Sequence, residues 1–251
     1  EGHIAIITLN RPERMNTISR DMLNQLTEHM LKADKDPAVR AVILTGTGRA
    51  FCAGLDLTEV TRPSEGGISN GNNNATNIDL KFTPPTVMFN MEKPTICALN
   101  GSAAGYGLDT ALGCDIRIMA PTATLALPET AVGIVPGWSG TQRLARLLPE
   151  PVLKEMVLFG RKLSAERALN LGFAAEVAED PCAAALEIAA RLYQTSARAT
   201  EVAKYMINAA VGEDSAAMIE ALGSGMIAAS ADKAEGVAAF RAKRKPAFPG
   251  A

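Results

Sequence analysis

Histidine and closely paired cysteine are scarce in this sequence. It has two histidines, His3 near the start and His29 in a predicted surface helix, and no CxxC pair among its four cysteines. A Ser-His-Asp triad and a histidine-rich metal site are therefore not expected. The widely spaced cysteines indicate reduced thiols, mostly small buried side chains, as in a cytoplasmic protein.

Long apolar runs, an excess of one charge and nucleotide-phosphate loops are also absent. No apolar run approaches about 18 residues and no signal peptide is recognisable, so no membrane partner is expected. The 25 basic and 27 acidic side chains give a net charge of −2, which provides no electrostatic surface for nucleic acid. No Walker-type lysine loop occurs, and residues 105–110 fail the GxGxxG pattern at its last position. The chain begins at Glu1 and not at methionine, which leaves preceding residues or a targeting leader open.

The composition is that of a globular protein with a large core. The 251 residues are 47% hydrophobic and 21% charged. Strand and helix patterns alternate over residues 1–180, whereas residues 181–251 are helical throughout and rich in alanine. We therefore expect a core of residues 1–180 and a terminal helical segment of residues 181–251, packed on the core or on another subunit.

Apolar runs and turn residues predict the elements of the core. Helices are expected after the N-caps Ser19 and Ser164 and over residues 140–148. Two strands separated by a helix-length spacer within residues 3–44 predict a parallel crossover. Residues 61–77 are rich in Gly, Asn and Ser, which indicates a loop, either a surface insertion or a lid. Strands are expected at residues 3–9, 39–44, 95–99, 115–119 and 124–127.

Residues 94–113 have the pattern of a site: a strand, a small-residue turn and a helix with Asp109 in its first turn. A helix start offers unpaired N–H groups and a partial positive charge. Tyr106 and Asp109 are three residues apart and share a helix face, so a backbone donor and a carboxylate are predicted to face one small volume. The alternative is structural: the glycines let the helix pack closely on the strand, and Asp109 is a solvated acid.

A second acid, Glu129, follows a predicted strand and Pro128. Paired acids near a helix terminus suit proton transfer, because one group can give a proton while the other takes one. Residues 52–54 offer a second backbone donor, which would complete an oxyanion hole with the N–H of Tyr106.

Further motifs follow one another along nearly the whole chain. They are residues 7–12 (ITLNRP), 51–56 (FCAGLD), 93–116, 128–129 (PE), 135–137 (VPG), 140–144 (GTQRL), 235–240 (EGVAAF) and 243–245 (KRK). Each motif alone is weak, but the ordered set resembles the crotonase superfamily, also called the enoyl-CoA hydratase/isomerase family.

The resemblance implies an α/β fold and an acyl-CoA thioester substrate. The fold is a spiral of ββα units with two nearly perpendicular sheets and a C-terminal helical region that builds homotrimers, often paired into homohexamers. CoA enters as part of the substrate, so no metal or tightly held cofactor is implied. The matching oxyanion-hole donors are the N–H groups of Ala53 and Tyr106, and the family usually has glycine in place of Tyr106.

The resemblance also implies residues that touch the CoA moiety. The matching positions are Arg14 and the four residues Ala53, Gly54, Leu55 and Asp56. A cationic side chain such as Arg14 near the CoA phosphates is physically sensible. Trp138, the only tryptophan, is predicted either to anchor packing or to contact the substrate.

The two acids match the catalytic positions of the hydratase branch. Glu129 would exchange the proton at the α-carbon of the thioester, and Asp109 would hold and deprotonate the water that adds at the β-carbon. Asp109 stands where that branch has glutamate, and its side chain is about 1.5 Å shorter. Aspartate here also resembles the dienoyl-CoA isomerase branch, but that branch has a further acid where this chain has Gly137.

The resemblance therefore predicts an enoyl-CoA hydratase with a branched, cyclic or aromatic acyl group left open. The alternative is an isomerase, or another crotonase-fold acyl-CoA enzyme, that needs only Glu129 and the oxyanion hole. A non-catalytic or RNA-binding member is disfavoured because no lysine-rich helix is present and the net charge is negative.

Overall fold

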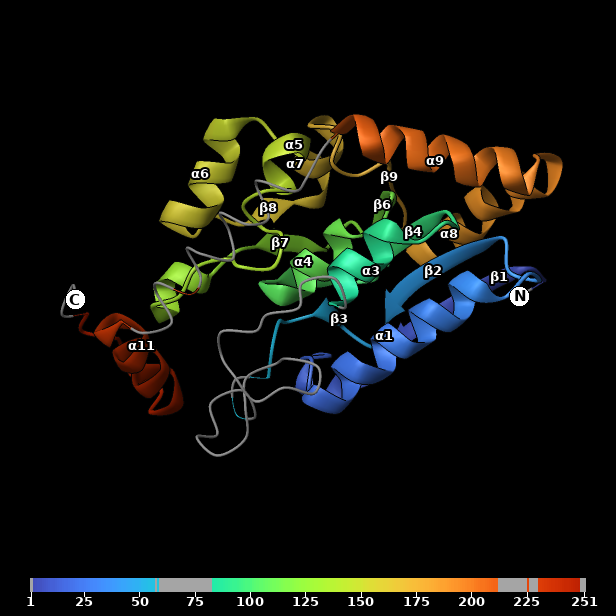
Figure 1. Cartoon of the computed structure of the whole chain (residues 1–251). Coiled ribbons are helices and arrows are strands. Elements are labelled where there is room, and N and C mark those ends of the chain that lie inside the picture. Colours follow the sequence, from blue (N-terminus) through green and yellow to red (C-terminus); the bar gives the residue numbers. More distant parts are fainter. Residues whose placement is uncertain (1, 57, 59–82, 212–224, 226–229, 249–251) are drawn as a thin grey trace.

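The computed structural model of the protein describes residues 2–56, 58, 83–211, 225 and 230–248. These residues form two sheets with helices around them (Figure 1). One sheet has five parallel strands in the order β1-β2-β4-β6-β9. The other has the order β3-β5-β7-β8, with β8 antiparallel to β7. The loop predicted at residues 61–77 lies outside the described residues.

The element bounds are as follows. The strands are β1 (Ile4–Leu9), β2 (Ala41–Gly46), β3 (Ala50–Cys52), β4 (Thr95–Leu99), β5 (Ser102–Ala104), β6 (Ile116–Met119), β7 (Thr124–Ala126), β8 (Leu163–Ser164) and β9 (Glu176–Val177). The α-helices are α1 (Arg20–Lys35), α3 (Pro84–Asn90), α4 (Tyr106–Leu112), α5 (Leu144–Leu147), α6 (Glu150–Phe159), α7 (Ala165–Asn170), α8 (Pro181–Ala190), α9 (Ala197–Val211) and α11 (Ala231–Arg241). The 3₁₀ helices are η1 (Pro12–Arg14), η3 (Glu129–Val132) and η4 (Arg191–Gln194).

Consecutive strands are divided between the two sheets. β2, β4 and β6 lie in the five-stranded sheet, and each is followed by a strand of the four-stranded sheet, β3, β5 and β7 respectively. Helix α4 begins shortly after β5 ends. This alternation is the ββα spiral that the resemblance implied, and it places the ends of β3, β5 and β7 beside one another.

Several predicted elements are confirmed, one predicted helix is shortened, and some short strands were not predicted. Ser19 Oγ accepts a hydrogen bond from the N–H of Met22 at 3.1 Å, and Ser164 Oγ accepts one from Arg167 at 3.2 Å. The parallel pairing of β1 with β2 is confirmed. The strands β3 and β5 were not predicted, because three residues are too short to show an alternating pattern. The helix predicted over residues 140–148 is reduced to α5, since residues 140–143 form turns.

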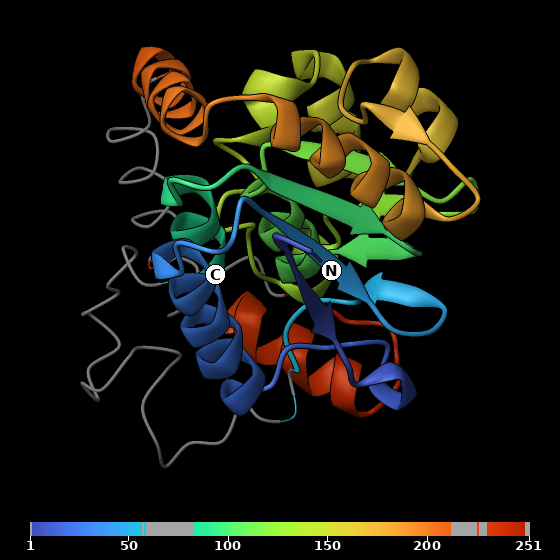
Figure 2. The ribbon, with the colours of Figure 1, turned by 90° about the vertical axis from the view of Figure 1, so that its right-hand side faces the viewer.

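The five-stranded sheet is covered on both faces. The β2 residues Val42 and Leu44 belong to the main apolar core, whereas Ile43 belongs to a second cluster that includes Ala185 of α8. α8 packs against β2, β4 and β6 (Figure 2). Burial on both faces explains why β2 is a continuous apolar run. The start of the predicted terminal segment thus packs on the core, and the boundary at residue 180 stays a prediction.

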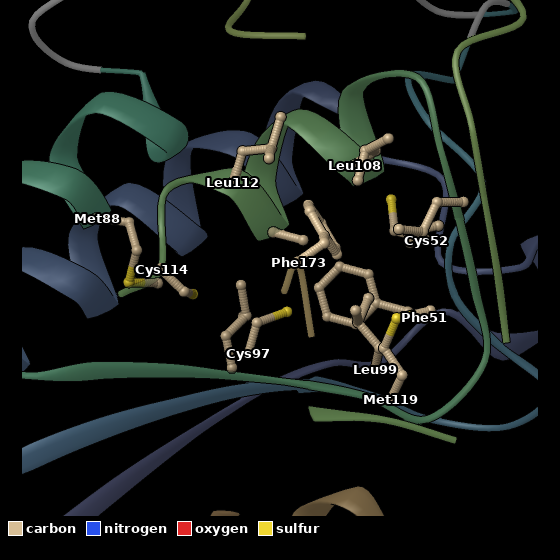
Figure 3. Close-up of a cluster of buried hydrophobic side chains, with 14 of the residues drawn as sticks. Phe51, Cys52, Met88, Cys97, Leu99, Leu108, Leu112, Cys114, Met119 and Phe173 are labelled. Carbon is tan, nitrogen blue, oxygen red and sulfur yellow. The ribbon is translucent and has the colours of Figure 1, made fainter. Parts of the chain in front are cut away.

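Helix α4 is surrounded by the main core. All seven of its residues are buried. Figure 3 shows Leu108 and Leu112 of this helix on one side of the apolar cluster and Phe51, Cys97 and Leu99 on its other side, nearer the strands. Packing on all sides holds the first turn of α4 in one position. None of the described helices combines the length and hydropathy of a membrane span.

We expect replacement of Asn16 by alanine to lower the free energy of unfolding by about 3 kcal/mol. Asn16 is fully buried, its Nδ2 donates to the carbonyls of Thr47 and Ala50 at 2.9 and 2.8 Å, and its Oδ1 accepts from the N–H of Arg11 at 2.8 Å. Urea unfolding would measure the loss. Asn208→Ala, which removes one partly buried bond to the carbonyl of Phe89, is the matched control. Equal losses in the two variants would contradict the prediction.

Candidate active site

The ends of three parallel strands meet at one edge of the four-stranded sheet. β3 runs into residues 53–55, β5 into Gly105 and Tyr106, and β7 into Pro128 and Glu129. The N–H of Gly105 donates to the carbonyl of Ala126 at 3.0 Å, which continues the pairing to this edge. Because the carboxyl ends of neighbouring parallel strands lie together, residues far apart in the sequence share one site.

Close approaches at two glycines define the size of the site. A methyl group on Gly105 would lie 3.1 Å from Oε1 of Glu129, and one on Gly54 would lie 3.8 Å from the backbone nitrogen of Tyr106. Both glycines have positive φ angles, +51° and +103°, which side-chain-bearing residues rarely adopt. The carboxylate of Glu129, the start of α4 and the turn at Gly54 therefore border one small volume.

Both predicted acids are buried. Asp109 lies in the first turn of α4 with 1% of its surface exposed, and Glu129 begins η3 with 8% exposed. A methyl group on Gly140 would lie 2.9 Å from Oδ1 of Asp109, so the loop after Trp138 closes over this carboxylate. The interpretation of Asp109 as a solvated first-turn acid is therefore wrong. Removing carboxylates from water costs free energy, and buried carboxylates that share one site are typical of functional sites.

The backbone hydrogen bonds correct the prediction that the N–H of Ala53 is an oxyanion-hole donor. The N–H of Ala53 donates to the carbonyl of Met15 at 3.0 Å, so it is engaged and does not face a ligand. Ile18 forms an isolated parallel bridge with Leu55, and this bridge uses the carbonyl of Gly54 and the N–H of Asp56. The N–H of Leu55 is therefore directed away from Ile18, and it makes no hydrogen bond to a described residue.

The N–H of Leu55 was not predicted as a donor, and the reason is the local backbone conformation. Along a regular extended chain, the N–H groups of Ala53 and Leu55 would point in the same direction. The φ angle of +103° at Gly54 interrupts this regular conformation. The N–H of Tyr106, the first residue of α4, also makes no hydrogen bond within the described residues. The donors that remain available are thus those of Leu55 and Tyr106.

Cys52 lies next to the site but is not a nucleophile in this environment. Its Sγ donates a hydrogen bond to the carbonyl of Asn16 at 3.1 Å. Burial raises the pKa of the Cys52 thiol to about 12, although a hydrogen bond with the Gly54 backbone acts in the opposite direction. The thiol therefore stays protonated. In the described part of the chain, no three His, Cys, Asp or Glu side chains are grouped to hold a metal ion.

Two of the predicted CoA-contacting residues, Asp56 and Arg14, lie in different environments. Burial by itself would raise the pKa of Asp56, but hydrogen bonds from Thr58 and the Arg11 guanidinium outweigh it, so this pKa lies below its ordinary value. Arg11 Nη1 lies 2.8 Å from Asp56 Oδ2, whereas Arg14 Nη2 lies 3.4 Å away and its side chain is half exposed. Asp56 thus holds this loop together through Arg11, which the sequence did not single out. Contact of Arg14 with CoA stays a prediction.

Tyr106 and Trp138 form an aromatic pair beside the acids. Their ring centroids are 5.8 Å apart and their planes are inclined by 80°, an edge-to-face contact. The Tyr106 ring is buried, whereas Trp138 is partly exposed. Ser139, with a φ of +143°, donates from Oγ to the carbonyl of Asp109 at 3.2 Å. Trp138 therefore has the packing role that was one of its two predicted roles.

The C-terminal helix α11 packs against the turn that carries Glu129, as Figure 1 also shows. A methyl group on Gly236 would lie 2.1 Å from the carbonyl oxygen of Val132, and one on Gly133 would lie 2.3 Å from that of Asp232. Such close contact requires glycine on both sides. α11 therefore positions η3 and, with it, the catalytic candidate Glu129, a role that the sequence pattern did not indicate.

Comparisons with known proteins identify the family. A family model described as enoyl-CoA hydratase/isomerase matches residues 1–251. The chain is 37% identical to the putative enoyl-CoA hydratase/isomerase YngF of Bacillus subtilis, covering 99% of this chain and 95% of that protein. It is 36% identical to the (E)-benzylidenesuccinyl-CoA hydratase of Thauera aromatica, covering 100% and 97%. The crystal structure of a carnitinyl-CoA hydratase from Mycobacterium avium is similar with a TM-score of 0.88 at 30% identity, covering 100% of this chain and 97% of that one. The chain therefore belongs to the enoyl-CoA hydratase/isomerase family of the crotonase superfamily.

Proposed function

We propose that the protein is an enoyl-CoA hydratase, which adds water across the α,β double bond of an enoyl-CoA thioester. The observation that carries this proposal is the burial of two carboxylates, Asp109 and Glu129, beside the backbone N–H of Tyr106. Moving a double bond needs one group that shuttles a proton. Adding water needs two, because the water loses a proton while the α-carbon gains one.

Each group has one role in the proposed reaction. The thioester oxygen accepts hydrogen bonds from the N–H groups of Leu55 and Tyr106, which stabilise the enolate. Asp109 accepts a proton from water as the water oxygen bonds to the β-carbon. Glu129 donates a proton to the α-carbon, and the enolate electrons return to form that C–H bond. The net change of the substrate is the addition of one water molecule, and proton exchange with solvent then returns Asp109 to the carboxylate and Glu129 to the acid.

An isomerase is the second candidate. Asp109 is about 1.5 Å shorter than glutamate, and a displacement of about 1 Å can cost about 100-fold in rate. If Asp109 does not reach the water, Glu129 and the two backbone donors still suffice to move a double bond. The names of the similar proteins include hydratases and a hydratase/isomerase, in agreement with either activity.

Product analysis would distinguish the two activities. The protein would be incubated with crotonyl-CoA and with branched, cyclic and aromatic 2-enoyl-CoAs, while the absorbance of the conjugated thioester is followed. Loss of absorbance with a mass gain of one water supports hydration, and the preferred member identifies the acyl group. A matched 3-enoyl-CoA would gain this absorbance if the enzyme is an isomerase. Isomerisation without hydration would contradict the proposal.

We expect Gly140→Ala to lower hydration by about 100-fold and to leave α-proton exchange nearly unchanged. The added methyl group would lie 2.9 Å from Oδ1 of Asp109 and 3.0 Å from Cδ2 of Leu127, so the carboxylate must move. Glu129 lies on η3 and is not displaced directly. Hydration would be measured by absorbance and α-proton exchange by mass spectrometry of a saturated acyl-CoA in D₂O. Equal losses of both activities would contradict this division of roles.

We also propose that the protein is a homotrimer or homohexamer. Helix α9 has a row of exposed apolar side chains, Val202, Tyr205, Met206 and Ile207. An apolar patch of this kind on a helix is typical of a subunit interface. Light scattering should give three or six times the chain mass of 26.4 kDa, and a monomer mass would contradict the proposal.

A further inference from the structure

We propose that the phenol of Tyr106 is a further catalytic group: it donates a hydrogen bond to the water that adds at the β-carbon and holds this water against Asp109. The inference rests on the proposed hydration and deepens it. It concerns the side chain of Tyr106, in addition to the backbone N–H that binds the thioester oxygen.

The position of the side chain is the first argument. Tyr106 and Asp109 are three residues apart in α4 and lie on the same helix face. The residue is 4% exposed, so its ring is enclosed by the protein. Among the charged groups around the phenol, Asp109 has the largest electrostatic effect on it. The hydroxyl and the carboxylate therefore belong to the same enclosed region of the site.

The hydroxyl of Tyr106 has no structural role among the described residues. Tyr106 Oη is buried and has no hydrogen-bond partner among them. By contrast, Tyr193 Oη accepts a hydrogen bond from the N–H of His3 at 3.2 Å. A buried hydroxyl without a partner destabilises the folded protein, and phenylalanine would pack equally well on Trp138. The hydroxyl is therefore explained by a partner that arrives with the reaction.

The phenol stays a donor throughout the neutral range. Burial, and then the negative charge of Asp109, raise the pKa of Tyr106 well above its ordinary value. Asp109, when ionised, accepts hydrogen bonds only. A water molecule between them can accept from the phenol and donate to the carboxylate. This arrangement orients a water lone pair without any change in the protonation of the tyrosine.

The shortened acid explains why a second group is useful. Aspartate at position 109 is about 1.5 Å shorter than glutamate, so it holds the water over a longer reach. The Tyr106 ring is fixed by its edge-to-face contact with Trp138 at 5.8 Å. Ser139, the next residue, donates to the carbonyl of Asp109 at 3.2 Å and ties the loop to α4. The phenol is thus a positioned donor and not a freely rotating one.

The proton balance of the reaction is unchanged by this role. The bond from water oxygen to the β-carbon forms while Asp109 takes the water proton. Tyr106 keeps its own proton and donates only a hydrogen bond. Glu129 supplies the proton of the new bond at the α-carbon. No further reactant is required.

Tyr106→Phe tests the proposal because it removes the hydroxyl and keeps the ring. We expect kcat for hydration to fall by about 100-fold, with KM changed less than about threefold. Exchange of the α-proton of a saturated acyl-CoA in D₂O should stay at the rate of the unmodified protein, because it uses only Glu129 and the backbone donors. The thermal midpoint should be equal or higher, because a buried hydroxyl is removed.

A matched variant shows whether the effect is specific. Tyr193→Phe removes a hydroxyl that has a protein partner, the N–H of His3. This variant should hydrate at the rate of the unmodified protein. If Tyr106→Phe hydrates at an unchanged rate, the role of the phenol is overturned but the proposed hydratase function is not. Parallel losses of hydration and α-proton exchange in this variant would also overturn it, because they indicate a distorted site. Absence of hydration by the unmodified protein would overturn the proposed function and this role together.

Discussion

Replacement of Glu129 by glutamine is expected to lower hydration and α-proton exchange together, each by about 10³-fold. Glutamine has the same shape but neither gives nor takes a proton at neutral pH. Glu129 is 8% exposed and lies against Gly105, so the neutral side chain occupies the same space. Binding of a saturated acyl-CoA should change little, because the backbone donors of Leu55 and Tyr106 remain.

Absorbance assays, deuterium exchange and titration calorimetry would measure these three properties. Glu166→Gln is the matched control, because Glu166 is an exposed acid in the first turn of α7. Retention of α-proton exchange in Glu129→Gln would contradict the assignment of Glu129 as the group that serves the α-carbon. Loss of acyl-CoA binding would indicate instead that the side chain shapes the pocket.

Replacement of Gly107 by alanine is expected to have the largest combined effect on stability and activity. The added methyl group would lie 2.4 Å from the carbonyl oxygen of Cys52 and 2.7 Å from its Cβ. Helix α4 would have to move away from the end of β3, which we expect to cost about 3 kcal/mol of unfolding free energy. The same movement separates the N–H of Tyr106 from that of Leu55, so the rate should fall by about 100-fold.

Urea unfolding and the hydration assay would measure the two effects. Gly160→Ala is the matched control: Gly160 has a φ of +66°, but nothing lies within 4 Å of its added methyl group. This variant should lose about 1 kcal/mol through backbone strain and keep its activity. A Gly107→Ala protein as stable and active as Gly160→Ala would contradict the close contact of α4 with β3.

Much of the fold was predictable from local patterns. The strand at residues 95–99, the caps at Ser19 and Ser164 and the parallel pairing of β1 and β2 follow from apolar periodicity and capping residues. The strands β3 and β5 were not predictable, because three residues in a second sheet are specified by their partners and not by a repeat of their own. The residues that form their partners are distant in the sequence.

The site, like the fold, was predictable only in part. Asp109, Glu129 and Tyr106 were identified by residue type and spacing, and the structure brings these three residues together. The engagement of the Ala53 N–H by Met15 was not visible, because it depends on a contact with a distant loop. Likewise, nothing local indicated that α11 would support the turn of Glu129.

The sequence by itself determined the family, the two acids and the tyrosine, because these depend on which side chains are present and in what order. The tertiary structure alone decided which backbone N–H groups face the site and how closely α4, β3, η3 and α11 approach one another. Almost every residue has a backbone N–H group, so the residue type does not show which of these groups faces the site. Their direction is set by chain conformation and by hydrogen bonds between segments that only folding brings into contact.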